Sequence, residues 1–481
     1  MAEVIVVGAG VAGLGAALGL AGQDHRVTVV ERDATTVPDS PDAAFEQWHR
    51  RGAPQVRHSH AFLARLRNLL RDRAPEVLED LLAAGATELR FLDHPPPTLE
   101  DRSPRPGDED LVALACRRTT FEWVLRRDAL GARRVGLVEG AVTGLVANGA
   151  DEGAPHVAGV RLADGRELRA DVVVDASGVR SPLPSWLAAI GAGAVPQREQ
   201  DTGIVYSSRF YRLLPGAEPP SPEGLVIGDM GYLKYAVFVG DNRTFSITFA
   251  IWTDDRELRQ LLRAGPFTAA ANTLAATRRW IEAGRAEPIT DVEVMARLLN
   301  RRRRFVIRGR PLATGIYAVG DSHICTNPLY GRGCSLAMVQ AYLLADTLSQ
   351  HAGDPVTAAV AFQEAMDREV EPWYRATVDR DRLERRPGGQ SVDAHEEARR
   401  LPLDDDTMRS LLRDGILPAA GTDPVVYRAF LRTFNLLTPP EAMMQDQDVT
   451  ARVLAVWQER DTRPAPPSLG PERDELLRIL A

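Results

Sequence analysis

Two glycine-rich motifs, far apart in the chain, could bind one ligand. The first has glycines at positions 8, 10 and 13 and follows an apolar run at the N-terminus. The second, Gly320-Asp321, follows another apolar run. Because a helix N-terminus attracts anions, the first motif predicts a site for a dinucleotide pyrophosphate. The second offers a carboxylate to the ribityl chain of FAD, a group that NAD lacks. Together the two motifs favour a flavin.

The residues around the first motif predict the strand–helix–strand unit that such a site needs. Residues 4–7 form a short apolar strand pattern, and residues 26–30 form a second one that ends in Glu31. Gly10 permits close approach of the pyrophosphate, and Gly13 lets the helix pack closely on the strand. Glu31 is expected to hydrogen-bond a ribose hydroxyl, and its charge would repel a 2′-phosphate.

The composition indicates two or three domains and no strong attraction for nucleic acid. The 481 residues carry a formal net charge of −8, and 44% of them are hydrophobic. No apolar run reaches the length of a membrane span, and no basic segment precedes the N-terminal apolar run. The three cysteines match no metal-binding spacing. We therefore expect a cytoplasmic protein with no membrane span, no signal peptide and no metal site.

The order of the predicted elements indicates an α/β fold with an inserted domain. Alternating apolar residues in three segments after residue 200 predict antiparallel strands, at 204–211, 233–239 and 244–252. A buried strand pattern returns at residues 316–319, so the nucleotide-binding domain is expected to be discontinuous. The expected division is a Rossmann-like FAD-binding domain at 1–200 plus 290–356, an antiparallel-sheet substrate domain at 201–289, and a C-terminal helical region at 357–481.

Local composition also predicts the segments that connect these parts. Residues 63–84 and 118–133 have helical patterns, whereas residues 38–54 are expected to form a polar loop. Residues 384–406 are charged and contain Gly and Pro, which is typical of a linker or a surface crossing.

Four spaced motifs resemble those of the FAD-dependent aromatic hydroxylase-like oxidoreductases, the group A flavin monooxygenases. The first glycine motif is followed by Arg118 with Phe121 and Leu125, then by Asp175-Ala176-Ser177-Gly178, and then by Gly320-Asp321 with Pro328, Gly331 and Gly333. The segment from Gly52 to His60 is similar to a loop of actinobacterial polyketide flavin epoxidases. The resemblance covers roughly residues 1–355 and implies a glutathione-reductase-like FAD-binding fold.

The resemblance implies cofactor contacts at particular positions. Asp321 would hydrogen-bond the ribityl chain, and the helix after Gly331 would face the pyrimidine end of the flavin, where reduced flavin is negatively charged. Arg118 would reach the FAD phosphates or ribose, and Arg57 and His58 the flavin or its pyrophosphate. The candidate cofactor-binding residues are Gly8, Gly10, Val11, Ala12, Gly13, Glu31, Arg32, Arg57, His58, Arg118, Asp321, Pro328, Gly331, Gly333 and Cys334. No catalytic residue is identified.

Several of these residues also have a purely structural interpretation. Asp321 could cap a helix or shape a turn, and Arg118 could be a solvated residue at a helix start. The His58 segment could cap the helix that follows it. Asp175 could simply shape a turn, and the cysteines could be small packing groups.

The resemblance further implies oxygen transfer to a bulky apolar secondary metabolite, by epoxidation or hydroxylation. O2 would react with reduced flavin to give a C4a-hydroperoxide, in a site that must exclude water. The aromatic residues of the inserted sheet are candidates to line this site: Tyr206, Phe210, Tyr235, Phe238, Phe245, Phe249 and Trp252. No second dinucleotide motif is present, so NAD(P)H is expected to bind transiently as electron donor, with a separate flavin reductase as the alternative.

Other activities share this cofactor module. An FAD-dependent reductase of the isoprenoid-reductase kind would work without oxygen, and a non-redox flavoprotein cyclase would use FAD as a structural group. A flavin-dependent halogenase would need a lysine near the substrate and a Trp-x-Trp-x-Ile-Pro segment. Here Lys234 is the only lysine and that segment is absent. The C-terminal helices could cover the site or form a dimer contact, so the oligomeric state stays open.

Overall fold

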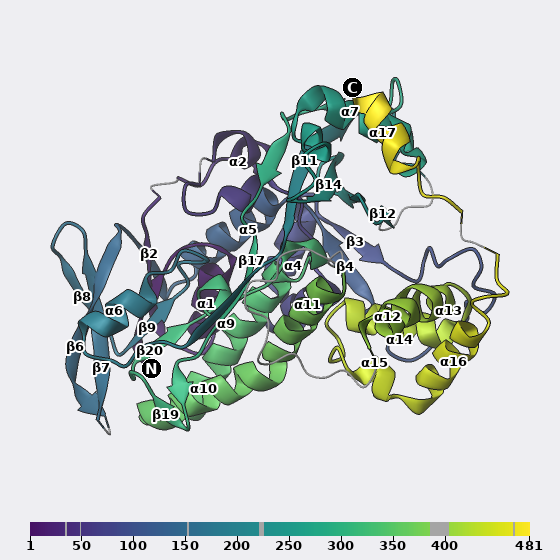
Figure 1. The fold of residues 1–481 in the computed structure, drawn as a ribbon. Helices are drawn as coiled ribbons and strands as arrows, with labels where there is room; N and C mark the ends of the chain where they lie inside the picture. Colours follow the sequence, from purple (N-terminus) through teal and green to yellow (C-terminus); the bar gives the residue numbers. More distant parts are fainter. Residues whose placement is uncertain (34–35, 49, 152, 221–225, 385–403, 465–466) are drawn as a thin grey trace.

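A five-stranded parallel sheet brings the two glycine motifs together. The structure is a computed structural model and describes all residues except 34–35, 49, 152, 221–225, 385–403 and 465–466. The sheet confirms the predicted Rossmann-like α/β fold, with the strands adjacent to one another as in Figure 1. In spatial order the strands are β20 (Ile316–Ala318), β9 (Val172–Asp175), β1 (Glu3–Val7), β2 (Arg26–Glu31) and β5 (Val135–Glu139).

The two faces of this sheet are covered differently. Val4 and Val6 of β1 belong to a core shared with three helices, α1 (Val11–Ala21), α5 (Arg118–Gly131) and α9 (Gly333–Gln350). Ile5 and Val7 point to the other face, because successive side chains of a strand alternate. There they join a core with the antiparallel strands β6 (Val142–Asp151), β7 (Ala154–Leu162) and β8 (Glu167–Arg169) and with α6 (Leu183–Ala189).

A six-stranded antiparallel sheet forms the second major layer. Its strands are β11 (Ile204–Leu213), β12 (Val226–Asp229), β13 (Lys234–Val239), β14 (Thr244–Trp252), β15 (Ala286–Pro288) and β16 (Glu293–Met295). The three strands predicted between residues 204 and 252 are therefore present. The strand β16 pairs with β11 although it lies past residue 289, so the sheet extends beyond the predicted inserted segment. The helices α7 (Ala264–Thr273) and α8 (Ala275–Ile281) contribute to the core on one face of this sheet.

Smaller sheets connect these layers. The strands β10 (Gln197–Asp201), β17 (Leu299–Arg303) and β21 (Ile324–Cys325) form a three-stranded sheet. Two-stranded ladders join β3 (Thr87–Arg90) to β4 (Val112–Ala115), and β18 (Val306–Ile307) to β19 (Arg310–Pro311). The strand β21 leads from the sheet edge at Gly320 towards the start of α9.

One local prediction was wrong, and another missed a break between two helices. Residues 38–54 are not only a loop, because α2 (Pro41–Gln47) forms there: the Ser40 hydroxyl accepts from the Ala43 N–H, and Phe45 is buried. Residues 63–84 are helical, as predicted, but they form two helices, α3 (Ala64–Arg73) and α4 (Pro75–Ala83). Pro75 cannot donate a backbone hydrogen bond and disfavours helical geometry at Ala74, which has φ −153°.

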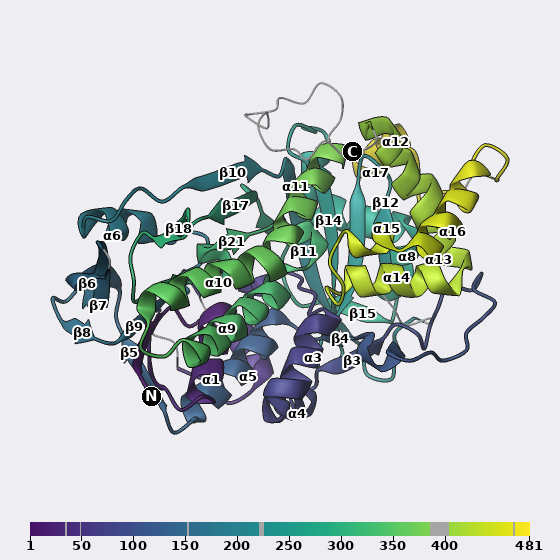
Figure 2. The ribbon, with the colours of Figure 1, turned by 90° about the horizontal axis from the view of Figure 1, so that it is seen from below.

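The C-terminal region is helical, as predicted, and reaches three parts of the molecule. Figure 2 shows α10 (Pro355–Glu369) and α11 (Glu371–Glu384) beside α9, with the later helices gathered at one end. The last helix, α17 (Arg473–Leu480), returns to the six-stranded sheet, where Leu476 is buried (Figure 1). The intervening helices are α12 (Asp405–Ser410), a π-helical turn (Leu411–Ile416), α13 (Leu417–Thr422), α14 (Pro424–Phe434), α15 (Ala442–Gln445) and α16 (Gln447–Gln458).

Most of the predicted linker at 384–406 lies outside the described residues. In the described part of the chain, every helix is too short or too polar to span a lipid bilayer.

Candidate functional site

The carboxyl edge of the parallel sheet collects four of the motif residues. Gly8 follows β1, Glu31 ends β2, Asp175 ends β9, and Gly320 follows β20. Gly320 lies against the start of α1, since a Cβ added at this glycine would be 2.7 Å from the Cβ of Ala12. The two glycine motifs are thus in direct contact. Ligands of open α/β sheets bind at this edge.

In the turn from β1 into α1, one glycine has room for a side chain and two others have none. Gly8 has φ +104°, and a Cβ there would be 2.7 Å from the Ala176 carbonyl oxygen; a Cβ at Gly13 would overlap the Gly8 carbonyl. At Gly10, which caps α1, an added Cβ would meet nothing within 4 Å. No side chain of the described residues caps this helix, so the first amides, including those of Val11 and Ala12, have no side-chain acceptor from them. These features fit a pyrophosphate.

Glu31 is buried and already holds the first turn. Its Oε2 accepts the Ala9 N–H at 2.8 Å, and its Oε1 accepts the Asp33 N–H at 2.9 Å. Arg50 donates to the same Oε2 at 3.1 Å. Arg32, the next residue in the chain, is exposed and lies near Gly52. Arg50 was missed by sequence reasoning, because its partners lie on distant segments and no local pattern marks it.

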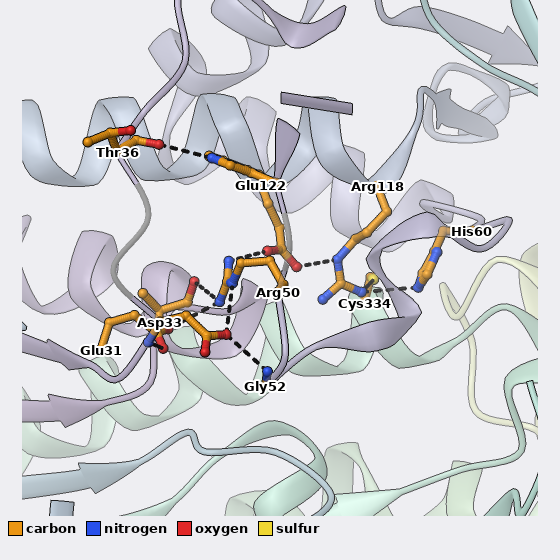
Figure 3. A network of polar contacts seen from close by, with 11 residues as sticks. Glu31, Asp33, Thr36, Arg50, Gly52, His60, Arg118, Glu122 and Cys334 are labelled. Atoms are coloured by element: carbon orange, nitrogen blue, oxygen red, sulfur yellow. Dashed lines mark hydrogen bonds and ion pairs between the residues drawn. The ribbon is translucent and has the colours of Figure 1, made fainter. Parts of the chain in front are cut away.

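A buried chain of charges links Glu31 to the start of α9 (Figure 3). Arg50 donates to Glu122 at 2.9 Å, and the other Glu122 oxygen accepts from Arg118 at 2.6 Å. Arg118 also lies 3.0 Å from the Cys334 sulfur. Arg118 and Glu122 are four residues apart on α5, a spacing that sequence reasoning could have recognised as an ion pair. Arg118 is therefore buried and not a solvated residue.

The turn at residues 327–333 leads into α9 and carries the second glycine pair. The Asn327 side chain accepts from the Leu329 N–H at 3.0 Å, and residues Pro328–Tyr330 form one 3-10 turn. Gly331 has φ +65°, and a Cβ there would be 2.9 Å from the Cβ of Ala61. A Cβ at Gly333 would meet nothing within 4 Å, and no described side chain caps α9. This helix start could therefore receive an anionic group.

Asp321 lies between the two helix starts with its carboxylate unengaged. Its backbone carbonyl accepts from Arg301 at 2.9 Å, whereas no described residue donates a hydrogen bond to the carboxylate. Burial raises the pKa of Asp321, and the nearby positive charges of Arg118 and Arg301 oppose that rise. A carboxylate that has no donor among the described residues fits a ligand hydroxyl group.

The side chains of the segment from Arg57 to His60 contact different parts of the molecule. Arg57 donates to the Glu46 carbonyl at 2.9 Å and so is turned towards α2. His58 is buried, its Nδ1 has no partner among the described residues, and burial lowers its pKa to about 4. His60 contacts Arg118 through Nε2 at 3.1 Å. Ser59 shares hydrogen bonds of 2.7 Å with Ser246 and Thr248 of β14, so this segment ties the site to the antiparallel sheet.

Strand alternation divides the aromatic residues of that sheet. Tyr206 belongs to a small apolar cluster with Trp252 and with Leu329 of the 327–333 turn. The cluster also contains Ile204, Ala250, Met295 and Leu298. Tyr235, Phe245 and Phe249 instead belong to the core shared with α7 and α8, so these three are not part of the apolar cluster at the turn. Phe210 packs edge-on against Phe45 of α2 at 5.2 Å.

Asp175 and His323 have hydrogen-bonding partners within the protein. Asp175 accepts hydrogen bonds from the Ser177 and Ser181 hydroxyls and shapes the turn after β9. His323 is buried, with Nδ1 3.2 Å from the Ala318 carbonyl. The three cysteines are free thiols. Within the described ranges, no group of three or more His, Cys, Asp or Glu side chains is arranged to hold a metal ion.

Comparisons with known proteins agree with this geometry. Residues 3–100 match the family model for FAD dependent oxidoreductase, and residues 99–189 match the model for tryptophan halogenase. Protein Rv3254 of Mycobacterium tuberculosis (strain ATCC 25618 / H37Rv) is 28% identical over 477 residues, and the match covers 90% of each protein.

Three solved structures share the fold. The flavin-dependent brominase Bmp2 has a TM-score of 0.62 at 17% identity, covering 96% of this chain and 100% of its own. The Diels-Alderase PyrE3 of pyrroindomycin biosynthesis has a TM-score of 0.58 at 17% identity, covering 90% and 80%. The third is pqsL of Pseudomonas aeruginosa, described as a probable FAD-dependent monooxygenase, with a TM-score of 0.55 at 16% identity, covering 79% and 95%.

The fold and the matched family models together define the class of this protein, which is an FAD-dependent oxidoreductase and hence an enzyme. Its structural neighbours include both halogenases and monooxygenases.

Proposed function

We propose that this enzyme is an FAD-dependent monooxygenase that transfers oxygen to a bulky apolar small molecule, a secondary metabolite, by epoxidation or hydroxylation. The observation that carries the proposal is the apolar cluster around Tyr206, which joins one face of the antiparallel sheet to Leu329 in the 327–333 turn. If this turn contacts the flavin, the cluster lies beside the cofactor, where an apolar substrate would be held away from water.

The residues of the two helix starts would hold FAD. The α1 amides after Gly10 would bind the pyrophosphate, Glu31 a ribose hydroxyl, and Asp321 the ribityl chain. The start of α9 at Gly333 would face the pyrimidine ring, and Arg118 would lie nearby because it contacts Cys334. Reduced FAD supplies the electrons that activate O2 in such enzymes.

The protein would contribute positioning and exclusion of water more than proton transfer. His58 and His60 are the histidines of the segment beside the antiparallel sheet, and burial lowers the pKa of both, to about 4 for His58 and about 3 for His60. Both are therefore neutral near pH 7, and neither is tuned to take a proton reversibly at that pH. Epoxidation of an alkene removes no substrate proton, so this environment suits it better than hydroxylation of a phenol.

We further propose NAD(P)H as the electron donor, binding transiently, with a separate flavin reductase as the alternative. A halogenase is disfavoured because Lys234 pairs with Glu384 at 3.1 Å and also with Asp229, which leaves its ammonium group engaged.

The test is anaerobic reduction of the FAD-loaded enzyme followed by mixing with O2, monitored by stopped-flow absorbance. Oxygen transfer is supported by a transient absorbance band that belongs neither to oxidised nor to reduced flavin and that decays faster when an apolar alkene is present. In the same reaction, 18O2 should label the product. Direct return to oxidised flavin with every alkene and phenol tried would favour the reductase. Product formation with oxidised flavin in the absence of O2 would favour the non-redox cyclase.

A further inference from the structure

A buried aspartate in the C-terminal region holds the turn that precedes α9. Asp381 lies on α11 and is 4% exposed. Its carboxylate accepts from the Asn300 amide at 2.7 Å, the Asn327 amide at 2.9 Å and the Tyr330 hydroxyl at 2.8 Å. Asn327 and Tyr330 belong to the 327–333 turn, whereas Asn300 lies on β17. One carboxylate therefore joins α11 to a sheet and to the turn.

The hydrogen bonds also connect the partners of Asp381 to one another. The Asn300 side-chain oxygen accepts the Asn327 backbone N–H at 2.6 Å. The Asn327 side-chain oxygen accepts the Leu329 N–H at 3.0 Å. The backbone N–H and both polar side-chain atoms of Asn327 are thus hydrogen-bonded and fix the path of the chain into the turn. Asp381 orients the side-chain amide of Asn327.

A second contact between α11 and the turn is made by Arg332. Its guanidinium donates to the Thr377 hydroxyl at 3.2 Å and lies over the rings of Tyr330 and Trp373, at 5.2 Å and 5.0 Å from their centres. Trp373, Thr377 and Asp381 are spaced four residues apart, so they present one face of α11 to the turn.

The contacts from α11 add to the turn's own hydrogen bonds, which join the Gly331 N–H to the Pro328 carbonyl at 2.9 Å and the Leu329 N–H to the Asn327 side chain at 3.0 Å. Gly331 takes the left-handed conformation at φ +65°, and a glycine loses more conformational freedom on ordering than any other residue. The turn leads directly into Gly333, so a shift of the turn moves the first amides of α9.

We propose that Asp381 is a positioning residue for the flavin: it fixes the 327–333 turn and so holds the N-terminus of α9 against the pyrimidine end of FAD. This inference rests on the proposed FAD site. Because α9 would stabilise the negative charge of reduced flavin, loss of the Asp381 contacts weakens the binding of reduced flavin more than that of oxidised flavin.

The test uses Asp381→Asn in the full-length protein. An amide presents N–H groups where the carboxylate accepts three donors, so at least one hydrogen bond is lost without a change of shape. We expect far-UV circular dichroism to be unchanged and FAD to bind about tenfold more weakly. The midpoint potential should fall by about 30 mV, the two-electron equivalent of a tenfold loss in relative affinity for reduced flavin. Glu364→Gln, an exposed carboxylate on α10, is the matched control and should change neither quantity.

Two further results separate the possible failures. If the wild-type protein binds no FAD at all, the proposed cofactor site is wrong, whatever Asp381 does. If the wild type binds FAD and Asp381→Asn has the same affinity and midpoint potential, the positioning role is overturned. Should Asp381→Asn not accumulate as folded protein, Tyr330→Phe decides, since it removes one donor and keeps the carboxylate. A smaller shift in the same direction supports the role, and an unchanged potential and affinity refutes it.

Discussion

Gly320 lies against Ala12, so that a Cβ at position 320 would stand 2.7 Å from the Ala12 methyl group. The backbone after β20 and the first turn of α1 are therefore in contact at the carboxyl edge of the sheet. This contact explains why both motifs need a small residue at that point.

Gly320→Ala should destabilise the protein by about 2–5 kcal/mol. Gly320 has φ +65°, where an L-residue costs roughly 1–2 kcal/mol, and the clash with Ala12 adds an overpacking cost of about 1–3 kcal/mol. Denaturant unfolding measures the change. The control is Gly353→Ala, at φ +87° with nothing within 4 Å of an added Cβ, which carries the conformational cost alone. Equal losses in the two variants would show that the contact with Ala12 is unimportant.

Gly10→Val should act on the ligand and leave the fold intact. The added side chain would project into the open space in front of α1, where the pyrophosphate is proposed to lie. We expect FAD affinity to fall at least about tenfold, equivalent to 1.4 kcal/mol, while the stability of the apoprotein changes by about 1 kcal/mol or less. Gly136→Val, on the edge strand β5 and also in open space, should bind FAD normally. A Gly10→Val protein that retains FAD as wild type does would disprove the assignment.

Asp321→Ala should weaken the retention of FAD on gel filtration, measured by the ratio of flavin to protein absorbance. Since the carboxylate accepts no hydrogen bond from the described residues, its removal costs the fold little, and the loss should appear in ligand affinity as about 1–3 kcal/mol. Asp291→Ala, an exposed aspartate, should retain FAD fully. Full retention by Asp321→Ala would mean that another residue holds the ribityl chain.

Glu122→Gln should lower the free energy of unfolding by about 3 kcal/mol. Glu122 is 1% exposed and accepts from both Arg50 and Arg118, so loss of its charge leaves two buried guanidinium groups without their shared counter-charge. Urea unfolding of the apoprotein measures this. Glu79→Gln, on the exposed face of α4, should change stability by less than about 0.5 kcal/mol. A similar small change in Glu122→Gln would show that other carboxylates, among them Glu31 and Asp33 beside Arg50, compensate these charges.

His323 should make stability depend on pH in the acid range. It is 1% exposed, and burial lowers its pKa from 6.5 to about 4. Between these values the unfolded chain binds a proton that the folded protein does not, so stability falls as pH decreases from 6.5 towards 4. The largest slope for one such group is about 1.4 kcal/mol per pH unit.

The comparison is between wild type and His323→Asn, each unfolded by denaturant at several pH values from 7.0 to 4.5. The variant should be less stable at pH 7 because packing is lost, but its stability should decline less steeply with acid. Parallel curves would show that His323 titrates alike in both states.

The apolar cluster around Tyr206 shows what local pattern could not predict. Period-two alternation marks β11 and β14 as strands, but both of their faces carry aromatic residues. Which of Tyr206 and Phe245 faces the 327–333 turn depends on what packs against each face, namely Leu329 on one side and the helices α7 and α8 on the other. The same holds for Arg50 and Asp381, whose partners come from distant segments.

The local sequence was enough to predict four features. These are the parallel strands, the glycine turn into α1, the helix that starts at Arg118, and the glycine pair before α9. Such features depend on backbone conformation and on the alternation of apolar side chains, which are local properties. The contact of Gly320 with Ala12, the charge chain through Glu122, and the hold of α11 on the turn exist only in three dimensions. They depend on which distant segments pack against one another in the folded protein. The spacing of residues along the chain does not determine this packing.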